Sequence, residues 1–329
     1  MAKPGLLVIF TEGDLVRGLG HVSRCSAYAQ GWMERGGQVC WVLDGDEAAV
    51  RMTGAPAVVR RQRWQDDPAQ APSDLRPDVV LVDSYCATPE VLEALAADAG
   101  ASIFVDDLRR TYPAGLVVHA APDKDARDPV AAVSIWLEGP GWQPLRTPFW
   151  DLKPRGSVRS SIERILVVIG GGDLRGMGPA MAALAGESHP GACVDLVMAP
   201  GHLAPEASPR LAVHSGLDAA AMASLMAEAD LAISGAGQTV FELARCGTPT
   251  VMIGIADNQQ ANLDHWPGLC GFIDAGRWDD IRLAERVRAG LTKMSSAKAR
   301  QAVSDRASAL VDGQGVRRLF DRLLPMSEG

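Results

Sequence analysis

A histidine that follows two closely spaced glycines is the strongest chemical signal in this sequence. His21 follows Gly18 and Gly20 and stands three residues before Arg24, just after an apolar run at residues 6–10. Glycines at a strand-to-helix junction let the backbone approach a ligand, and the first N–H groups of the next helix attract anions. Histidine readily exchanges protons near neutral pH. The segment therefore predicts proton transfer on a phosphate-bearing ligand, the alternative being a histidine that only caps the helix.

A second glycine-rich turn predicts a nucleotide site. It follows an apolar run at residues 231–233 and opens a helix-like stretch. Backbone N–H groups at a helix start, together with nearby polar side chains, can hold a diphosphate. Glu242 lies one turn on and could accept hydrogen bonds from a ribose diol. The alternative is a tight turn with a solvated glutamate. The diphosphate candidates are Gly235, Ala236, Gly237, Gln238 and Thr239.

Other polar groups follow apolar runs at the positions where strands are expected to end. Asp83 and Tyr85 follow residues 79–82 and could position a sugar or a water molecule. Asp106 and Asp107 follow residues 103–105, and a pair of acids there is compatible with either turn formation or catalysis. The remaining candidates are Gly171 and Gly172, which we expect to contact the ligand, and Asp257, Asn258 and Gln259, which suit sugar hydroxyls or a helix cap.

Composition narrows the class of protein. The 329 residues carry a net charge of −8, which argues against nucleic acid or an anionic membrane as partner. The six cysteines form no CxxC pair, and the histidines show no metal-ligand spacing, so we expect reduced thiols, no metal and no cofactor. No apolar run is long enough for membrane insertion. The sequence predicts a cytoplasmic protein, and its composition leaves the oligomeric state open.

The pattern of apolar runs and helix-like stretches predicts an α/β fold. Short runs without polar alternation are typical of parallel strands covered on both faces. The same alternation restarts after a polar segment at residues 153–161. We therefore expect two Rossmann-like domains with parallel sheets facing across a cleft, and ligand binding at the carboxyl ends of the strands. The expected parts are residues 1–152, residues 162–312 and a C-terminal helix at 313–329 that packs back on the first domain.

Five motifs, in order, resemble one protein family along nearly the whole chain. They are GLGHVSRC, VDSY, VDDL, VIGGGD and ISGAGQTVFELARCGTPTVMIGIADNQ. The set resembles the PseG/SpsG group, which contains the UDP-sugar hydrolase of pseudaminic acid biosynthesis and its spore-coat-polysaccharide relatives. The resemblance implies a GT-B fold like that of MurG, with UDP bound by the C-terminal domain. The segment FTEGD at residues 10–14 is closer to the spore-coat branch.

The resemblance also implies an activity and assigns residues to it. The family enzyme hydrolyses UDP-2,4-diacetamido-2,4,6-trideoxy-β-L-altropyranose with an activated water. By this resemblance His21 is the catalytic histidine, Tyr85 the accompanying tyrosine, and Glu242 part of the nucleotide grip, while Met222 lies near the base. The expected partner is therefore a UDP-sugar substrate. A glycosyltransferase, an inactive nucleotide-sugar sensor and a 2-epimerase are the alternatives that the sequence leaves open.

Overall fold

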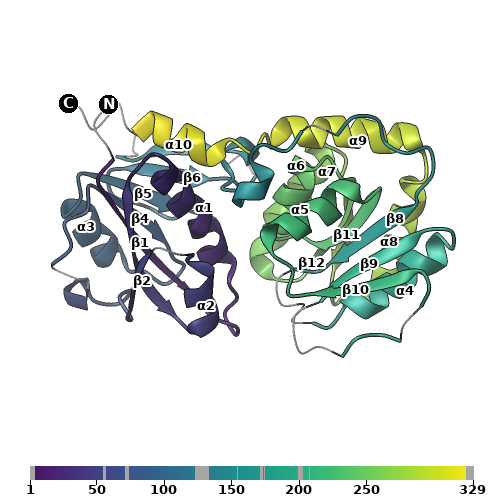
Figure 1. Cartoon of the computed structure of the whole chain (residues 1–329), viewed down its shortest axis with the longest axis horizontal. Coiled ribbons are helices and arrows are strands. Elements are labelled where there is room, and N and C mark those ends of the chain that lie inside the picture. The colour runs from purple at the N-terminus through teal and green to yellow at the C-terminus, as the bar shows by residue number, and fades with distance from the viewer. Residues whose placement is uncertain are drawn as a thin grey trace. The chain divides into compact units, whose positions relative to one another are not determined.

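The chain divides into two compact units. Unit 1 comprises Met1–Thr147 and Gln314–Gly329, and unit 2 comprises Pro148–Gly313. The computed structural model describes residues 4–54, 57–70, 74–122, 133–153, 155–170, 173, 175–198, 203–206 and 208–323. Each unit is an α/β fold built on its own sheet (Figure 1).

Unit 1 contains a seven-stranded sheet with the order β3-β2-β1-β4-β5-β6-β7, in which every strand pair is parallel. Its strands are β1 (Leu6–Gly13), β2 (Gln38–Gly45), β3 (Val58–Arg61), β4 (Val79–Asp83), β5 (Ala101–Val105), β6 (Leu116–His119) and β7 (Ile135–Glu138). Its helices are α1 (Gly20–Glu34), α2 (Glu47–Met52), α3 (Pro89–Ala97) and α10 (Gly315–Leu323). Because β1 and β4 pair at the centre of the sheet, their carboxyl ends are neighbours.

Unit 2 contains a six-stranded parallel sheet with the order β10-β9-β8-β11-β12-β13. Its strands are β8 (Arg164–Val168), β9 (Cys193–Met198), β10 (Leu211–Ser215), β11 (Leu231–Gly235), β12 (Thr250–Gly254) and β13 (Ile273–Arg277). Its helices are α4 (Gly178–Ser188), α5 (Ala219–Glu228), α6 (Thr239–Arg245), α7 (Gln260–Leu269), α8 (Leu283–Lys293) and α9 (Ala297–Leu310). Short 3-10 turns complete the fold, among them Pro140–Trp142, Thr147–Phe149 and Asp257–Gln259.

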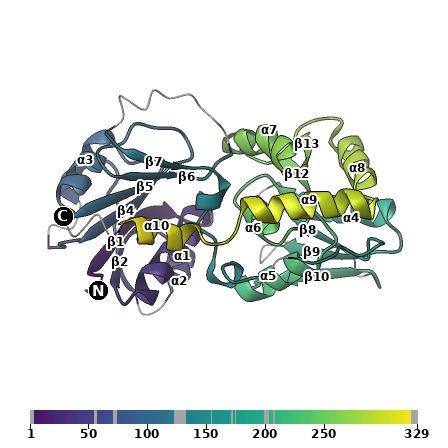
Figure 2. The same ribbon diagram turned by 90° about the horizontal axis from the view of Figure 1, so that it is seen from above.

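The central strands are apolar on both faces because helices cover both sides of each sheet. In β1 the side chains of Leu7, Val8 and Ile9 are fully buried. The C-terminal helix α10 packs on α1 within unit 1, as Figure 2 shows from above. Phe320 of α10 lies edge-on to Trp32 of α1, with ring centroids 5.1 Å apart. The last helix is therefore part of the unit 1 core, although it follows unit 2 in the chain.

The expected α/β class with parallel sheets is confirmed, and the differences concern individual elements. Helix α1 begins at Gly20, so His21 lies in the first helical turn. Several strands were not predicted because they are partly exposed or, in the buried β6, because only three apolar residues precede His119. These strands are β3, β6, β7, β10 and β13.

Candidate active site

Polar side chains gather in unit 1 where β1, β4 and β5 end. Glu12 is the penultimate residue of β1, and Asp83 is the last residue of β4. Asp107 follows β5 by two positions, and the first turns of α1 present His21 and Arg24. Parallel pairing brings these carboxyl ends to one edge of the sheet, which is where α/β proteins bind ligands.

Arg24 connects two carboxylates in this cluster. Its Nε and Nη2 atoms donate to the two oxygens of Asp83 at 2.5 and 2.6 Å, and its Nη1 donates to Oδ2 of Asp107 at 2.7 Å. Burial opposes charge on both partners, but their mutual attraction outweighs it. The pKa of Asp83 is lowered below its ordinary value, and the pKa of Arg24 is raised well above its own. The buried pair is therefore fully ionised near neutral pH, with fixed geometry.

One ring nitrogen of His21 faces two carboxylates. Its Nδ1 lies 3.7 Å from Oδ1 of Asp83 and 3.9 Å from Oε1 of Glu12. Two carboxylates beside Nδ1 favour a proton on that nitrogen, which leaves Nε2 as the basic atom. The imidazole stands edge-on to the ring of Tyr85, with centroids 4.3 Å apart and planes at 87°. His21 is thus positioned by two acids and by the ring of Tyr85.

Glu12 fixes the backbone of the loop that carries Tyr85. Its Oε1 accepts the Ser84 hydroxyl and the Tyr85 backbone N–H, both at 2.9 Å, while Gln65 donates to Oε2 at 3.3 Å. Arg110 contacts the same loop by donating to the carbonyl oxygens of Ser84, Tyr85 and Ala87. Sequence reasoning missed Glu12 as a site residue. An acid near the end of an otherwise apolar strand was the available signal.

Asp106 and Asp107 take different roles although they are adjacent. Asp106 is buried and accepts hydrogen bonds from the backbone N–H groups of Arg109 and Arg110, from the Tyr112 hydroxyl and from Nδ1 of His119. Burial opposes its ionisation, but these hydrogen bonds lower its pKa below the ordinary value. Asp106 therefore shapes the loop after β5, whereas Asp107 faces Arg24 and Tyr85.

The two glycines before His21 differ in whether the fold requires a glycine at that position. Gly18 has a φ of +97°, a conformation that a side chain disfavours, and it closes a turn in which the Asp14 carboxylate accepts the N–H groups of Val16 and Arg17. Gly20 opens α1, and a Cβ at this position would have no heavy atom within 4 Å. The backbone conformation therefore accounts for glycine at residue 18. At residue 20 the protein has room for a side chain, so packing does not account for glycine there.

The predicted nucleotide segment of unit 2 forms the junction between β11 and α6. Thr239 is the first residue of α6, so Glu242 lies one turn along the same helix. Gln238, Thr239 and Glu242 are half-buried. At Gly235 a Cβ would lie 2.4 Å from the carbonyl oxygen of Ile169, so close strand packing alone accounts for that glycine.

The segment of residues 257–259 borders this junction. Asn262 donates to the carbonyl of Ala236 at 2.7 Å, and a Cβ on Gly237 would lie 3.2 Å from Nε2 of Gln259. Asp257 and Asn258 are exposed, and Asp257 pairs with Arg277 at 2.7 Å. The predicted residues 235–239, Glu242 and Gln259 thus lie in one region of unit 2.

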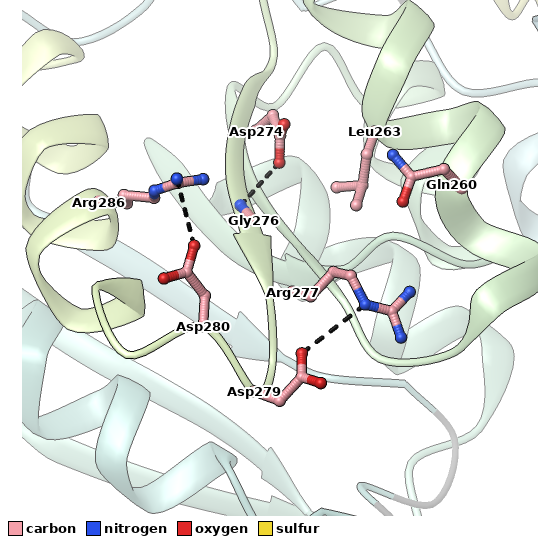
Figure 3. A pocket seen from close by; sticks show the side chains of 8 residues that line it. All are labelled: Gln260, Leu263, Asp274, Gly276, Arg277, Asp279, Asp280 and Arg286. Carbon is pink, nitrogen blue, oxygen red and sulfur yellow. Dashed lines mark hydrogen bonds and ion pairs between the residues drawn. The ribbon is translucent and has the colours of Figure 1, made fainter.

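A pocket of about 470 Å³ opens beside that region, between α7, β13 and α8 (Figure 3). Its arginines face pocket carboxylates: Arg286 lies 3.2 Å from Asp280, and Arg277 lies 3.7 Å from Asp279. No predicted site residue lines it, although Gln260 directly follows the 257–259 segment. The pocket therefore borders the predicted nucleotide segment, to which it is connected by the ion pair between Arg277 and Asp257.

Met222 and the glycines at residues 171 and 172 complete the set of predicted site residues. Met222 is half-buried on α5. Gly171 and Gly172 lie outside the described residues. Asp173 is buried with φ +37°, and its carboxylate accepts the N–H groups of Met177 and Gly178 at the start of α4.

In the part of the chain that is described, no cluster of three or more His, Cys, Asp or Glu side chains could hold a metal ion. Every helix in the described ranges is too short or too polar to span a bilayer.

Comparison with known proteins gives one curated relative and many similar folds. No protein-family model matches the chain. The spore coat polysaccharide biosynthesis protein SpsG of Bacillus subtilis is 22% identical over 325 residues, which cover 94% of this chain and 95% of SpsG. The chain is therefore a distant homologue of SpsG over nearly its full length.

Solved glycosyltransferases share the fold. MurG of Acinetobacter baumannii matches with a TM-score of 0.67 and 15% identity, covering 98% of this chain and 99% of MurG. The spinosyn rhamnosyltransferase SpnG, in complex with thymidine diphosphate, matches with a TM-score of 0.64 and 15% identity over 96% of this chain and 99% of SpnG. These likenesses confirm the GT-B fold class that the sequence motifs predict.

Proposed function

We propose that this chain, as a distant homologue of SpsG, is a nucleotide-sugar hydrolase that releases UDP and a free amino-deoxy sugar of the pseudaminic acid type. One observation carries the proposal. At the edge of a parallel sheet where α/β proteins bind ligands, Nδ1 of His21 faces two carboxylates, and the imidazole ring stands edge-on to the ring of Tyr85. That arrangement supports a general base at residue 21, and the resemblance of the Gly-x-Gly-His motif to that of the family hydrolase supports the same role.

The reaction we propose needs one water and one base. Water attacks the anomeric carbon while its proton passes to Nε2 of His21, and the bond between that carbon and the glycosyl oxygen breaks. UDP leaves with the bonding electrons, and the sugar keeps the oxygen of the water. Asp83 helps to orient the ring, with Oδ1 3.7 Å from Nδ1. In unit 2, the junction at residues 235–239 and Glu242 would hold the nucleotide.

The second candidate is a GT-B glycosyltransferase that uses a UDP-sugar donor in polysaccharide synthesis. It is favoured by the similar folds of MurG and SpnG. The same base would then deprotonate a sugar hydroxyl in place of water.

Incubation of the purified protein with a panel of UDP-sugars, without an acceptor, distinguishes the hydrolase from the transferase. We expect UDP release and a free sugar by NMR. If UDP appears only when an acceptor is added, the protein is a transferase.

Two variants divide the proposed roles. His21→Asn should abolish UDP release and leave UDP affinity, measured by calorimetry, nearly unchanged. Glu242→Gln should weaken UDP binding because a neutral amide is a poorer acceptor for a ribose diol. His214→Asn is the matched histidine control, since His214 lies on β10 of unit 2 and pairs with Asp195 of β9 at 2.8 Å. Full turnover by His21→Asn would exclude the assigned base.

A further inference from the structure

The Tyr85 hydroxyl donates to a carboxylate. Its Oη lies 2.7 Å from Oδ2 of Asp107. An ionised carboxylate can only accept, so the single phenolic proton points toward Asp107. With its proton directed to Asp107, the Tyr85 oxygen can accept a hydrogen bond from a ligand. Tyr85 is 37% exposed, so a ligand can reach it.

Asp107 is itself held in place from two directions. The same Oδ2 atom accepts Nη1 of Arg24 at 2.7 Å, and Arg24 is fixed by its two bonds to Asp83. The preceding residue, Asp106, is anchored by the hydrogen bonds that shape the loop after β5. The carboxylate that receives the phenolic proton therefore has little freedom to move.

We propose that Asp107 is a positioning residue that fixes the direction of the Tyr85 hydroxyl proton, so that Tyr85 and His21 present two acceptors side by side. This inference rests on the proposed function and deepens it. Nε2 of His21 and Oη of Tyr85 can then each accept one proton of the same water, which turns a lone pair of that water toward the anomeric carbon. A tyrosine free to rotate would donate to the water or to the imidazole and would spoil this orientation.

A pair of substitutions at residue 107 separates positioning from charge. Asp107→Ala removes the acceptor, and we expect kcat for UDP release to fall about tenfold with little change in KM. Asp107→Asn keeps a carbonyl oxygen that can accept from Tyr85, so it should recover most of kcat although the charge is gone. Asp74→Ala, which breaks an exposed arginine pair elsewhere in unit 1, is the control and should leave kcat unchanged.

A double-mutant cycle with Tyr85→Phe tests whether Asp107 acts through the phenol. If it does, Asp107→Ala has almost no further effect on kcat in the Tyr85→Phe background. An undiminished tenfold loss in that background, or an Asn variant as slow as the Ala variant, would overturn the inference.

A neutron structure of the wild-type protein gives a test that needs no activity. We expect the Tyr85 deuteron between Oη and Oδ2 of Asp107. A deuteron that points elsewhere overturns the inference, even in an active enzyme. If the deuteron lies there but no UDP-sugar is hydrolysed, the proposed function fails and the proton assignment stands.

Discussion

Oδ1 of Asp83 lies 3.7 Å from Nδ1 of His21 and also accepts Nη2 of Arg24 at 2.6 Å. One carboxylate thus serves a buried arginine and the proposed catalytic histidine together. The arginine keeps the carboxylate ionised, and the ionised carboxylate in turn favours a proton on Nδ1. Stability and reactivity are therefore linked at this residue, and substitutions around it should affect both.

Asp83→Asn should reveal a pH-dependent part of the stability. The folded-state pKa of Asp83 is lowered, so its ion pair stabilises the fold above the unfolded pKa of about 4 and is lost as pH falls through the folded pKa. Urea unfolding of wild type and variant should differ most near pH 7, and the difference should shrink as the pH is lowered below about 4. A difference that stays constant from pH 7 to pH 3 would contradict this account.

Arg24→Lys tests whether the geometry of the guanidinium matters beyond its charge. Three N–H groups of Arg24 reach two carboxylates, and a single ammonium cannot reproduce that pattern. We expect a loss of about 3 kcal/mol in the free energy of unfolding, because buried carboxylate oxygens lose their partners. Arg60→Lys is the control, since Arg60 makes a similar two-bond contact with exposed Asp74. Equal losses of unfolding free energy in the two variants would show that burial of the Arg24 contacts does not increase their contribution to stability.

The sequence predicted the parts of the site that depend on local patterns. Asp83 and Tyr85 were predicted because they stand just after an apolar run, and His21 because of its glycines. The roles of Glu12 and Asp107 were not predictable in this way. Glu12 binds the backbone of Tyr85, 73 positions further along the chain, only because β1 and β4 are paired. Strand order is a tertiary property that a single sequence does not encode in its spacing.

Chelation should leave the reaction unaffected. Both oxygens of Asp83 accept hydrogen bonds from Arg24, and the guanidinium charge opposes a divalent cation beside them. We expect UDP release to proceed at the same rate in excess EDTA and after dialysis against it. A loss of rate that added Mg²⁺ restores would show that a metal ion takes part in the reaction.

Gly20→Ala separates a glycine needed by a ligand from one needed by the fold. The open space around a Cβ at residue 20 and its position in α1 predict a stability equal to wild type or higher by roughly 0.5 kcal/mol. If substrate approaches this backbone, the added methyl group should raise KM for the UDP-sugar severalfold. Gly18→Ala is the matched control, because its φ of +97° predicts a loss of about 1 kcal/mol in stability. Thermal unfolding and steady-state kinetics on both variants measure these effects. An unchanged KM in Gly20→Ala would mean that the substrate does not approach the start of α1.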